Sequence, residues 1–177
     1  MKKIITILIV FSAIAVKSQV AIGKASVSNT SVSLEFADTE NRGLILPYVT
    51  DKSGILEDGT IIYDATDHKV KYLKDKTLSQ PWFDLSVDTT GTIAGADIQG
   101  SDKTEISAAK ISIGANETAD TTHNILELTD KDKAMILPKV ASPHTAIINP
   151  SAGMLVYDTT KRQLAVYNGN VWTFWKP

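Results

Sequence analysis

Cysteine is absent from this chain of 177 residues. That absence excludes disulfide frameworks, thiolate metal sites and cysteine nucleophiles. An excess of one charge is missing too, because 18 basic residues face 20 acidic ones and leave a formal net charge of −2. This balance, without a basic cluster, argues against nucleic acid as a partner. Stability must therefore come from apolar burial, from backbone pairing or from association between copies.

Long apolar runs are also scarce, and the one present lies at the start of the chain. Lys2 and Lys3 precede an almost continuously apolar stretch over residues 4–16. This stretch is shorter than the roughly 20 residues that a membrane-spanning helix needs. A positive start, a short apolar core, and Val16 and Ser18 before the cleavage site are typical of a signal peptide over residues 1–18. The alternatives are an uncleaved anchor or a buried first helix.

The expected localisation follows from this segment. We expect export through a cleaved signal peptide to the extracellular space or the cell surface, with the periplasm as the alternative. No second apolar run of spanning length follows, so we expect no membrane span in the mature chain.

Short motifs occur twice along the chain, in the same order. Gly59–Asp64 recurs as Gly153–Asp158, and Leu44–Pro47 recurs as Met135–Pro138. The other repeated pairs are Ile22-Gly23 and Ile113-Gly114, Leu34–Phe36 and Leu126–Leu128, Val70–Leu73 and Leu164–Tyr167, and Trp82 and Trp172. We therefore predict a β module 1 over residues 19–85 and a β module 2 over residues 111–177, joined by a polar linker over residues 86–110.

Alternating apolar residues predict a three-stranded antiparallel meander in each module. In the second module the strands are Met154–Tyr157, Gln163–Tyr167 and Val171–Trp175, and Asn168-Gly169 predicts a two-residue type I′ turn. In the first module they are Thr60–Tyr63, Val70–Leu73 and a strand from Trp82, with a longer second connection over residues 74–81.

Short strands are expected upstream of each meander, and proline ends the second of each pair. These strands are Val32–Phe36, Leu44–Leu46, Ile125–Leu128 and Met135–Leu137. After residue 18 we expect at most one helical turn, at Thr145–Ile148, because no helical apolar period is sustained. The predicted class is all-β, as two tandem small modules. A disulfide-free module of this size is near the lower limit of independent stability, which favours packing between modules or between chains.

The repeated motifs resemble a large group of flavobacterial-type secreted proteins, and the hairpin is similar to modules of phage tail fibres. The residues that carry the resemblance are Ile113-Gly114, Ile136–Pro138, Pro150–Thr159 and Leu164–Trp172. Lys139-Val140 and Tyr48-Val49 stand where the group usually has Arg-Met. The resemblance implies export and a surface or fibre-like setting, and it implies no enzyme and no catalytic residues.

Motifs for catalysis and for metal or cofactor binding are missing as well. His68, His123 and His144 are not at metal-ligand spacing, and no nucleophile elbow or phosphate-binding glycine loop occurs. Asp130 and Asp132 alternate with lysines, which favours a solvated turn over weak calcium binding. We expect no enzyme activity, no cofactor and no metal.

Aromatic residues make up only 7% of the chain, yet they recur at equivalent positions. One face of each meander fills the core, and the other can present rings to a glycan or a partner. The candidate contact residues are Tyr63, Tyr72, Trp82, Tyr157, Tyr167, Trp172 and Trp175. Core packing is the favoured role for Trp172, whereas Trp175 is equally suited to either role.

Two functions compete on this evidence. The first is a non-enzymatic structural or adhesive component of a surface or fibre, with self-association into a trimer or another homo-oligomer, or binding to other surface proteins. The alternative is a stand-alone carbohydrate-binding module that uses the repeated aromatic positions. A glycan hydrolase would need two placed carboxylates, and the sequence offers no convincing pair.

Overall fold

Strands dominate the computed structural model, which describes residues 19–93, 109–114 and 125–176. The predicted signal peptide lies outside these residues. The all-β prediction is confirmed for the described part of the chain, where four sheets are accompanied by one short helix. The proposed division into two modules and a linker stays a prediction.

The first sheet joins the two halves of the chain. It has the order β1-β2-β10, and both pairings are parallel. The strands are β1 (Val20–Ile22), β2 (Val32–Phe36) and β10 (Ala134–Ile136). β2 is buried along most of its length because it is the central strand.

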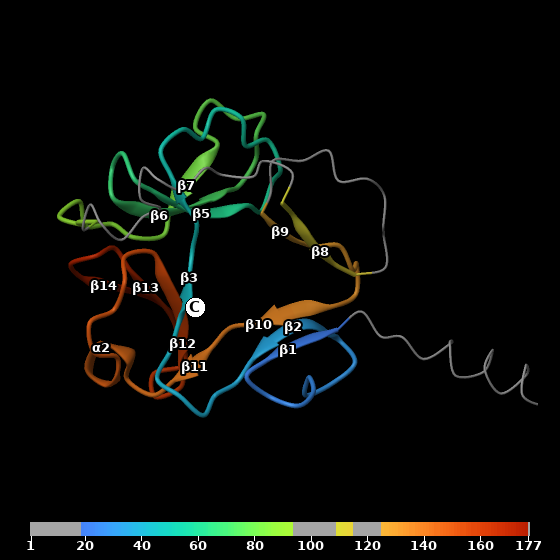
Figure 1. The fold of residues 1–177 in the computed structure, drawn as a ribbon. Helices are drawn as coiled ribbons and strands as arrows, with labels where there is room; N and C mark the ends of the chain where they lie inside the picture. The colour runs from blue at the N-terminus through green and yellow to red at the C-terminus, as the bar shows by residue number, and fades with distance from the viewer. Residues whose placement is uncertain (1–18, 94–108, 115–124, 177) are drawn as a thin grey trace, which may run out of the picture.

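The second sheet contains the C-terminal meander. It has the order β11-β12-β13-β14, and β3 from the first half pairs antiparallel with β12. The strands are β3 (Leu44–Ile45), β11 (Lys139–Val140), β12 (Met154–Asp158), β13 (Gln163–Tyr167) and β14 (Trp172–Trp175). Figure 1 shows β3 running from the β1–β2 sheet past β12 toward the sheet that contains β5.

The third sheet contains the other meander, in the order β4-β5-β6-β7. The strands are β4 (Tyr48–Val49), β5 (Ile61–Asp64), β6 (Lys69–Leu73) and β7 (Trp82–Asp84). A separate two-stranded parallel sheet pairs β8 (Ile111–Ile113) with β9 (Leu126–Leu128). The predicted strands of both meanders are confirmed to within one residue, whereas β1, β4, β8 and β11 were not predicted.

The two halves repeat the same backbone contacts. Tyr63 N–H donates to the Pro47 carbonyl over 3.0 Å, and Tyr157 N–H donates to the Pro138 carbonyl over 2.9 Å. Tyr48 pairs with Tyr63 as Lys139 pairs with Tyr157. The first hairpin loops are equivalent too, since His68 and Arg162 both take a positive φ, of 60° and 55°. The repeated motifs thus form the same local structure twice.

The second hairpin of the C-terminal meander differs from the prediction. A type I′ turn at Asn168-Gly169 is wrong, because only Gly169 of the two has a positive φ. The Asn168 side-chain oxygen accepts the N–H groups of Asn170 and Val171, over 2.9 and 2.8 Å. This local capping fixes Asn168 outside the left-handed region and moves the turn to Gly169-Asn170.

The predicted helical turn is displaced by two residues. The helix α2 covers Pro143–Ala146, and Ile147 ends it in an extended conformation. Proline at the first helical position explains the start, because its φ is already helical.

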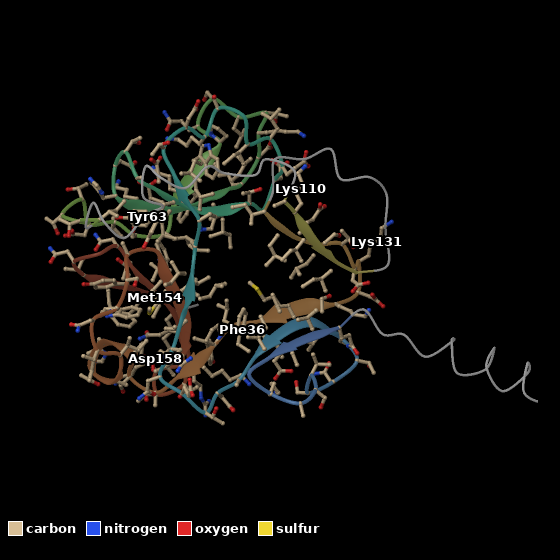
Figure 2. All side chains as sticks on the ribbon, in the orientation of Figure 1. Phe36, Tyr63, Lys110, Lys131, Met154 and Asp158 are labelled. Atoms are coloured by element: carbon tan, nitrogen blue, oxygen red, sulfur yellow. The ribbon has the colours of Figure 1, made fainter. Side chains whose placement is uncertain are left out.

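Residues from both halves form one apolar core. Its buried members are Leu46, Tyr63 and Val70 from the first half and Ala152, Leu155 and Val166 from the second. A smaller cluster beneath the C-terminal meander contains Val140, Met154, Val156 and Ala165. Figure 2 places Tyr63 and Met154 on neighbouring sheets. The halves therefore pack on each other within one chain.

Candidate functional site: the junction between the two halves

Two tyrosines of the first half reach the second half at the shared core. Tyr48 Oη donates to the Ala152 carbonyl, and Tyr63 Oη donates to the Asn168 carbonyl, each over 2.8 Å. Their rings meet edge to face with centroids 5.3 Å apart. Tyr63 is fully buried, and this burial raises the pKa of its phenol to about 12, with smaller contributions from Tyr48, Asp67 and Asp64.

Glycine allows the close approach at this junction. Gly153 has a φ of +72°, and a Cβ added there would lie 3.0 Å from the Tyr63 Cβ. A side chain at Gly153 would therefore meet both an unfavourable backbone conformation and the tyrosine. The Gly153 carbonyl also accepts the N–H of Leu46 over 3.1 Å, which continues the β3–β12 pairing.

Asn168 is the polar centre of the junction and is fully buried. Its side-chain amide donates to the Asp88 carbonyl over 3.0 Å, while its own carbonyl accepts from Tyr63. It therefore connects the C-terminal hairpin, the first half and the segment after β7. A buried amide with all these partners stabilises one arrangement of the three elements.

The first residues of the predicted linker pack into the fold. Val70 N–H donates to Ser86 Oγ over 2.8 Å, and Asn170 Nδ2 donates to Thr90 Oγ1 over 2.6 Å. Ile93 packs against the shared core. Residues 94–108, with Ile98 and Ile106, lie outside the described residues.

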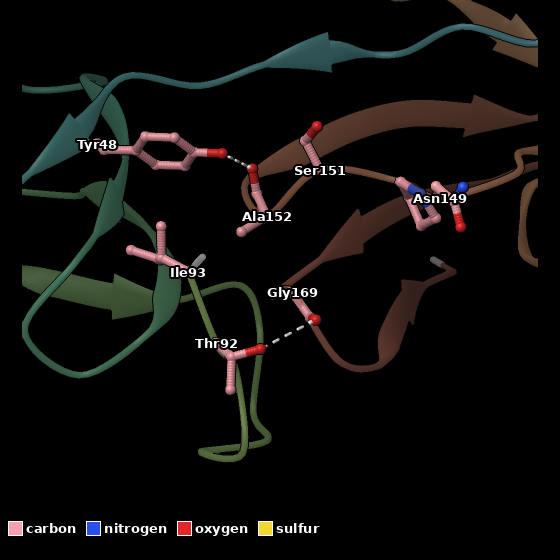
Figure 3. A pocket seen from close by; sticks show the side chains of 8 residues that line it. Tyr48, Thr92, Ile93, Asn149, Ser151, Ala152 and Gly169 are labelled. Atoms are coloured by element: carbon pink, nitrogen blue, oxygen red, sulfur yellow. Dashed lines mark hydrogen bonds between the residues drawn. The ribbon is translucent and has the colours of Figure 1, made fainter. Parts of the chain in front are cut away.

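A shallow pocket of about 260 Å³ lies beside the junction (Figure 3). Two hydrogen bonds join residues that line it, from Tyr48 to Ala152 and from Thr92 to Gly169. Its lining residues are Tyr48, Thr92, Ile93, Asn149, Pro150, Ser151, Ala152 and Gly169. None of them carries a carboxylate, an imidazole or an amine, so the lining supplies no general acid or base of those kinds.

Buried carboxylates support the turns that follow β5 and β12. Asp158 is fully buried, and Oδ1 accepts the N–H groups of Thr160 and Ser142, over 2.9 and 3.2 Å. Burial raises the pKa of this carboxyl group, but the hydrogen bonds from Ser142, Lys161, Thr160 and Gln163 outweigh burial and lower the pKa overall.

The equivalent Asp64 has the same place in the first half. It accepts the Thr66 N–H over 3.0 Å and pairs with Lys52 Nζ over 2.6 Å. Burial alone would raise its pKa, and the bonds to Lys52 and Thr66 lower it. Turn capping therefore explains the aspartate of the repeated motif and the threonine two residues after it.

Asp130 does not behave as a solvated turn residue, and that prediction is wrong. Its side chain is only 4% exposed. Its Oδ2 accepts from Ser33 Oγ and from Lys133 Nζ, each over 3.0 Å. The residue lies close to β2 of the first half because β10, which follows it, pairs with β2. Within the described residues, no group of three acidic or histidine side chains is arranged to hold a metal ion.

The predicted aromatic contact residues fall into different environments. Tyr63 is buried, Tyr72, Trp82, Tyr167 and Trp172 are half-buried, and Tyr157 and Trp175 are each 36% exposed. Phe83 contacts both Tyr72 and Trp175, and Trp172 contacts both Tyr167 and Phe174. The indole of Trp175 also donates to the Leu85 carbonyl. The seven residues do not form one continuous face.

Sequence reasoning missed Tyr48, Gly153 and Asn168 as junction residues. The sequence indicates Gly153 as a repeated residue and Asn168 as a turn residue, and both also have these roles. For Tyr48 a signal existed, because it departs from the Arg that the resembling group usually has there. Nothing local to Asn168 indicates that its carbonyl meets a tyrosine 105 residues away in sequence.

The described residues define an all-β protein whose halves are held by an aromatic and amide junction. Residues 112–176 match the family of the phage tail like trimerisation region. This match supports the resemblance to tail-fibre modules for the second half. No curated protein and no solved structure matches the chain. Within the part of the chain that the structure covers, no helix has the length and apolar character to cross a membrane.

Proposed function

We propose that this protein is an exported, non-enzymatic structural subunit of a fibre-like homotrimer, built from two tandem β modules. The observation that carries the proposal is the match of residues 112–176 to a phage tail like trimerisation region. The adhesive role, the surface location and the cleavage of residues 1–18 belong to the same proposal and rest on the sequence.

Apolar side chains at the surface support assembly. Within the described residues the β8–β9 sheet has two strands, and Ile111, Ile125 and Leu126 on or beside it are 61%, 55% and 42% exposed. Ile148, just after α2, is 85% exposed. Open strand edges and clustered exposed apolar residues are typical of surfaces that other chains cover.

The solution mass of the chain from Gln19 tests the proposal, by light scattering over a wide concentration range. We expect a mass three times that of one chain, which falls only on strong dilution. A chain that stays monomeric at every concentration would contradict the fibre-like trimer.

A carbohydrate-binding role is the second candidate. It is favoured by the partly exposed rings of Phe174 and Trp175 on the last strand, which offer apolar surface to a sugar. Tryptophan fluorescence titrated with a broad glycan panel tests it. A spectral shift with a saturable dependence on glycan would support binding, and an unchanged spectrum across the panel would exclude it.

A further inference from the structure

The contact between the halves consists of two parts that each occur twice in the chain. We name Tyr48 and Tyr63 the inner knob, and Ala152, Gly153 and Asn168 the inner socket. The inner knob fills the inner socket through the two tyrosine hydroxyl hydrogen bonds and the close approach to Gly153.

The second half carries an equivalent of the inner knob. Lys139 and Tyr157, the outer knob, pair in the register that Tyr48 and Tyr63 use. Their surroundings differ, because Tyr157 is 36% exposed and Tyr63 is 0% exposed. Lys139 is exposed as well. A motif that is buried in its first copy therefore lies at the surface in its second.

The first half carries an equivalent of the inner socket. Asp58, Gly59 and Lys74, the outer socket, stand at the repeat positions of Ala152, Gly153 and Asn168. Gly59 has a φ of +88° and donates to Leu73 over 2.7 Å, as Gly153 donates to Tyr167 over 2.8 Å. An added Cβ at Gly59 would meet nothing within 4 Å, so this socket is open.

We propose that the outer knob of one chain docks into the outer socket of a second copy, in the manner of the contact between the halves. The proposal rests on the proposed homotrimer and names its surfaces. In the inner contact Tyr48 Oη donates to the main-chain carbonyl of Ala152, and the equivalent acceptor of the outer socket is the main-chain carbonyl of Asp58. In the docked pair Lys139 would approach this carbonyl and the Asp58 carboxylate beside it, and this attraction between opposite charges favours the pairing.

A contact between two different surfaces is head to tail. Such contacts close into a ring when the rotation between copies permits, and three copies make the smallest cyclic assembly after a dimer. The matched region 112–176 contains a knob, with Lys139 and Tyr157, and a socket, with Gly153 and Asn168. Among the described residues the first half fills that socket, and the outer knob and the outer socket stay uncovered for neighbouring copies.

Charge reversal at the two positions tests the docking. We would compare the wild-type chain from Gln19 with Lys139→Glu, Asp58→Lys and the double variant, by sedimentation over a concentration series. Each single variant places like charges at the contact, so we expect the concentration for half-assembly to rise at least about tenfold. The double variant restores opposite charges and should return close to the wild-type value.

Matched variants separate a docking effect from a general charge effect. Lys131→Glu makes the same charge change at an exposed lysine, which lies at the far side of the molecule from Asp158 in Figure 2. The docking predicts that it leaves assembly unchanged; because Lys131 follows β9 closely, a loss of assembly would point to a contact through the β8–β9 sheet and would overturn the docking. Tyr157→Ala should weaken assembly as the single reversals do, with an unchanged far-UV spectrum, because its side chain is not part of the buried core.

The outcomes distinguish this docking from the trimer itself. A wild-type trimer that Lys139→Glu and Asp58→Lys leave intact would overturn the docking and keep the proposed function. A wild-type trimer that both reversals weaken, without recovery in the double variant, would overturn the pairing of Lys139 with Asp58. A wild-type monomer at every concentration would overturn the proposed function and the docking with it.

Discussion

Replacing Tyr63 by phenylalanine removes one hydroxyl group from the centre of the junction. The hydroxyl donates to the Asn168 carbonyl over 2.8 Å, and both residues are fully buried. Water cannot replace the lost donor without opening the core. Loss of one partner of a buried hydrogen bond costs about 1–3 kcal/mol of unfolding free energy. We expect a value near the middle of that range, about 2 kcal/mol.

The equivalent residue of the second half provides the control. Tyr157 also precedes an aspartate and has the equivalent backbone pairing, but it is 36% exposed. Tyr157→Phe should change the unfolding free energy by less than about 0.5 kcal/mol, as surface substitutions usually do. Tyr63→Ala should cost about 3–5 kcal/mol, because it also leaves a cavity.

Urea unfolding followed by tryptophan fluorescence measures these differences. The experiment belongs at concentrations too low for assembly, so that only folding within one chain contributes. Equal effects of Tyr63→Phe and Tyr157→Phe would refute the burial argument. A change in the slope of the unfolding free energy against urea concentration would indicate that the halves unfold separately in the variant.

Three further predictions concern the same junction and the turns beside it. The contribution of Tyr63 to the unfolding free energy should be fully present below pH 10 and be lost as the pH rises toward 12. The reason is that the folded chain favours the neutral phenol, whose pKa is raised from 10.0 to about 12. Tyr63→Phe should flatten this part of a pH profile of the melting temperature. Asp158→Ala should lower the unfolding free energy by about 2 kcal/mol, because it leaves backbone N–H groups without an acceptor. Asp132 is exposed, so Asp132→Ala should be near neutral in the same urea assay. Gly153→Ala should lower the melting temperature more than Gly59→Ala, because both residues have positive φ but only Gly153 faces Tyr63.

Local pattern was sufficient to find the hairpins. Alternating apolar residues in Gln163–Tyr167, and turn-forming residues before it, place the strand correctly because a hairpin depends on neighbours in sequence. Very short strands such as β4 and β11 were missed, since two residues carry no period. Their pairing depends on a proline carbonyl that meets the next strand.

The turn at Asn168 shows where prediction from a dipeptide fails. Asn-Gly favours a type I′ turn when only backbone conformation matters. Here the Asn168 side chain caps the turn on one side and reaches Asp88 on the other. The local capping opposes the type I′ turn that the dipeptide alone predicts, and the contact with Asp88, 80 residues away, holds the same side chain in place.

The all-β class, the repeated motifs and most strands of the two meanders can be predicted from the amino-acid sequence, because they follow from side-chain alternation and turn residues. The pairing of β3 with β12 and of β10 with β2 becomes visible only in the folded chain. The same holds for the burial of Tyr63 and the exposure of Tyr157. The two tyrosines lie in the same motif, so their environments differ only through what packs against them, and strand pairing between distant segments is set by the whole core.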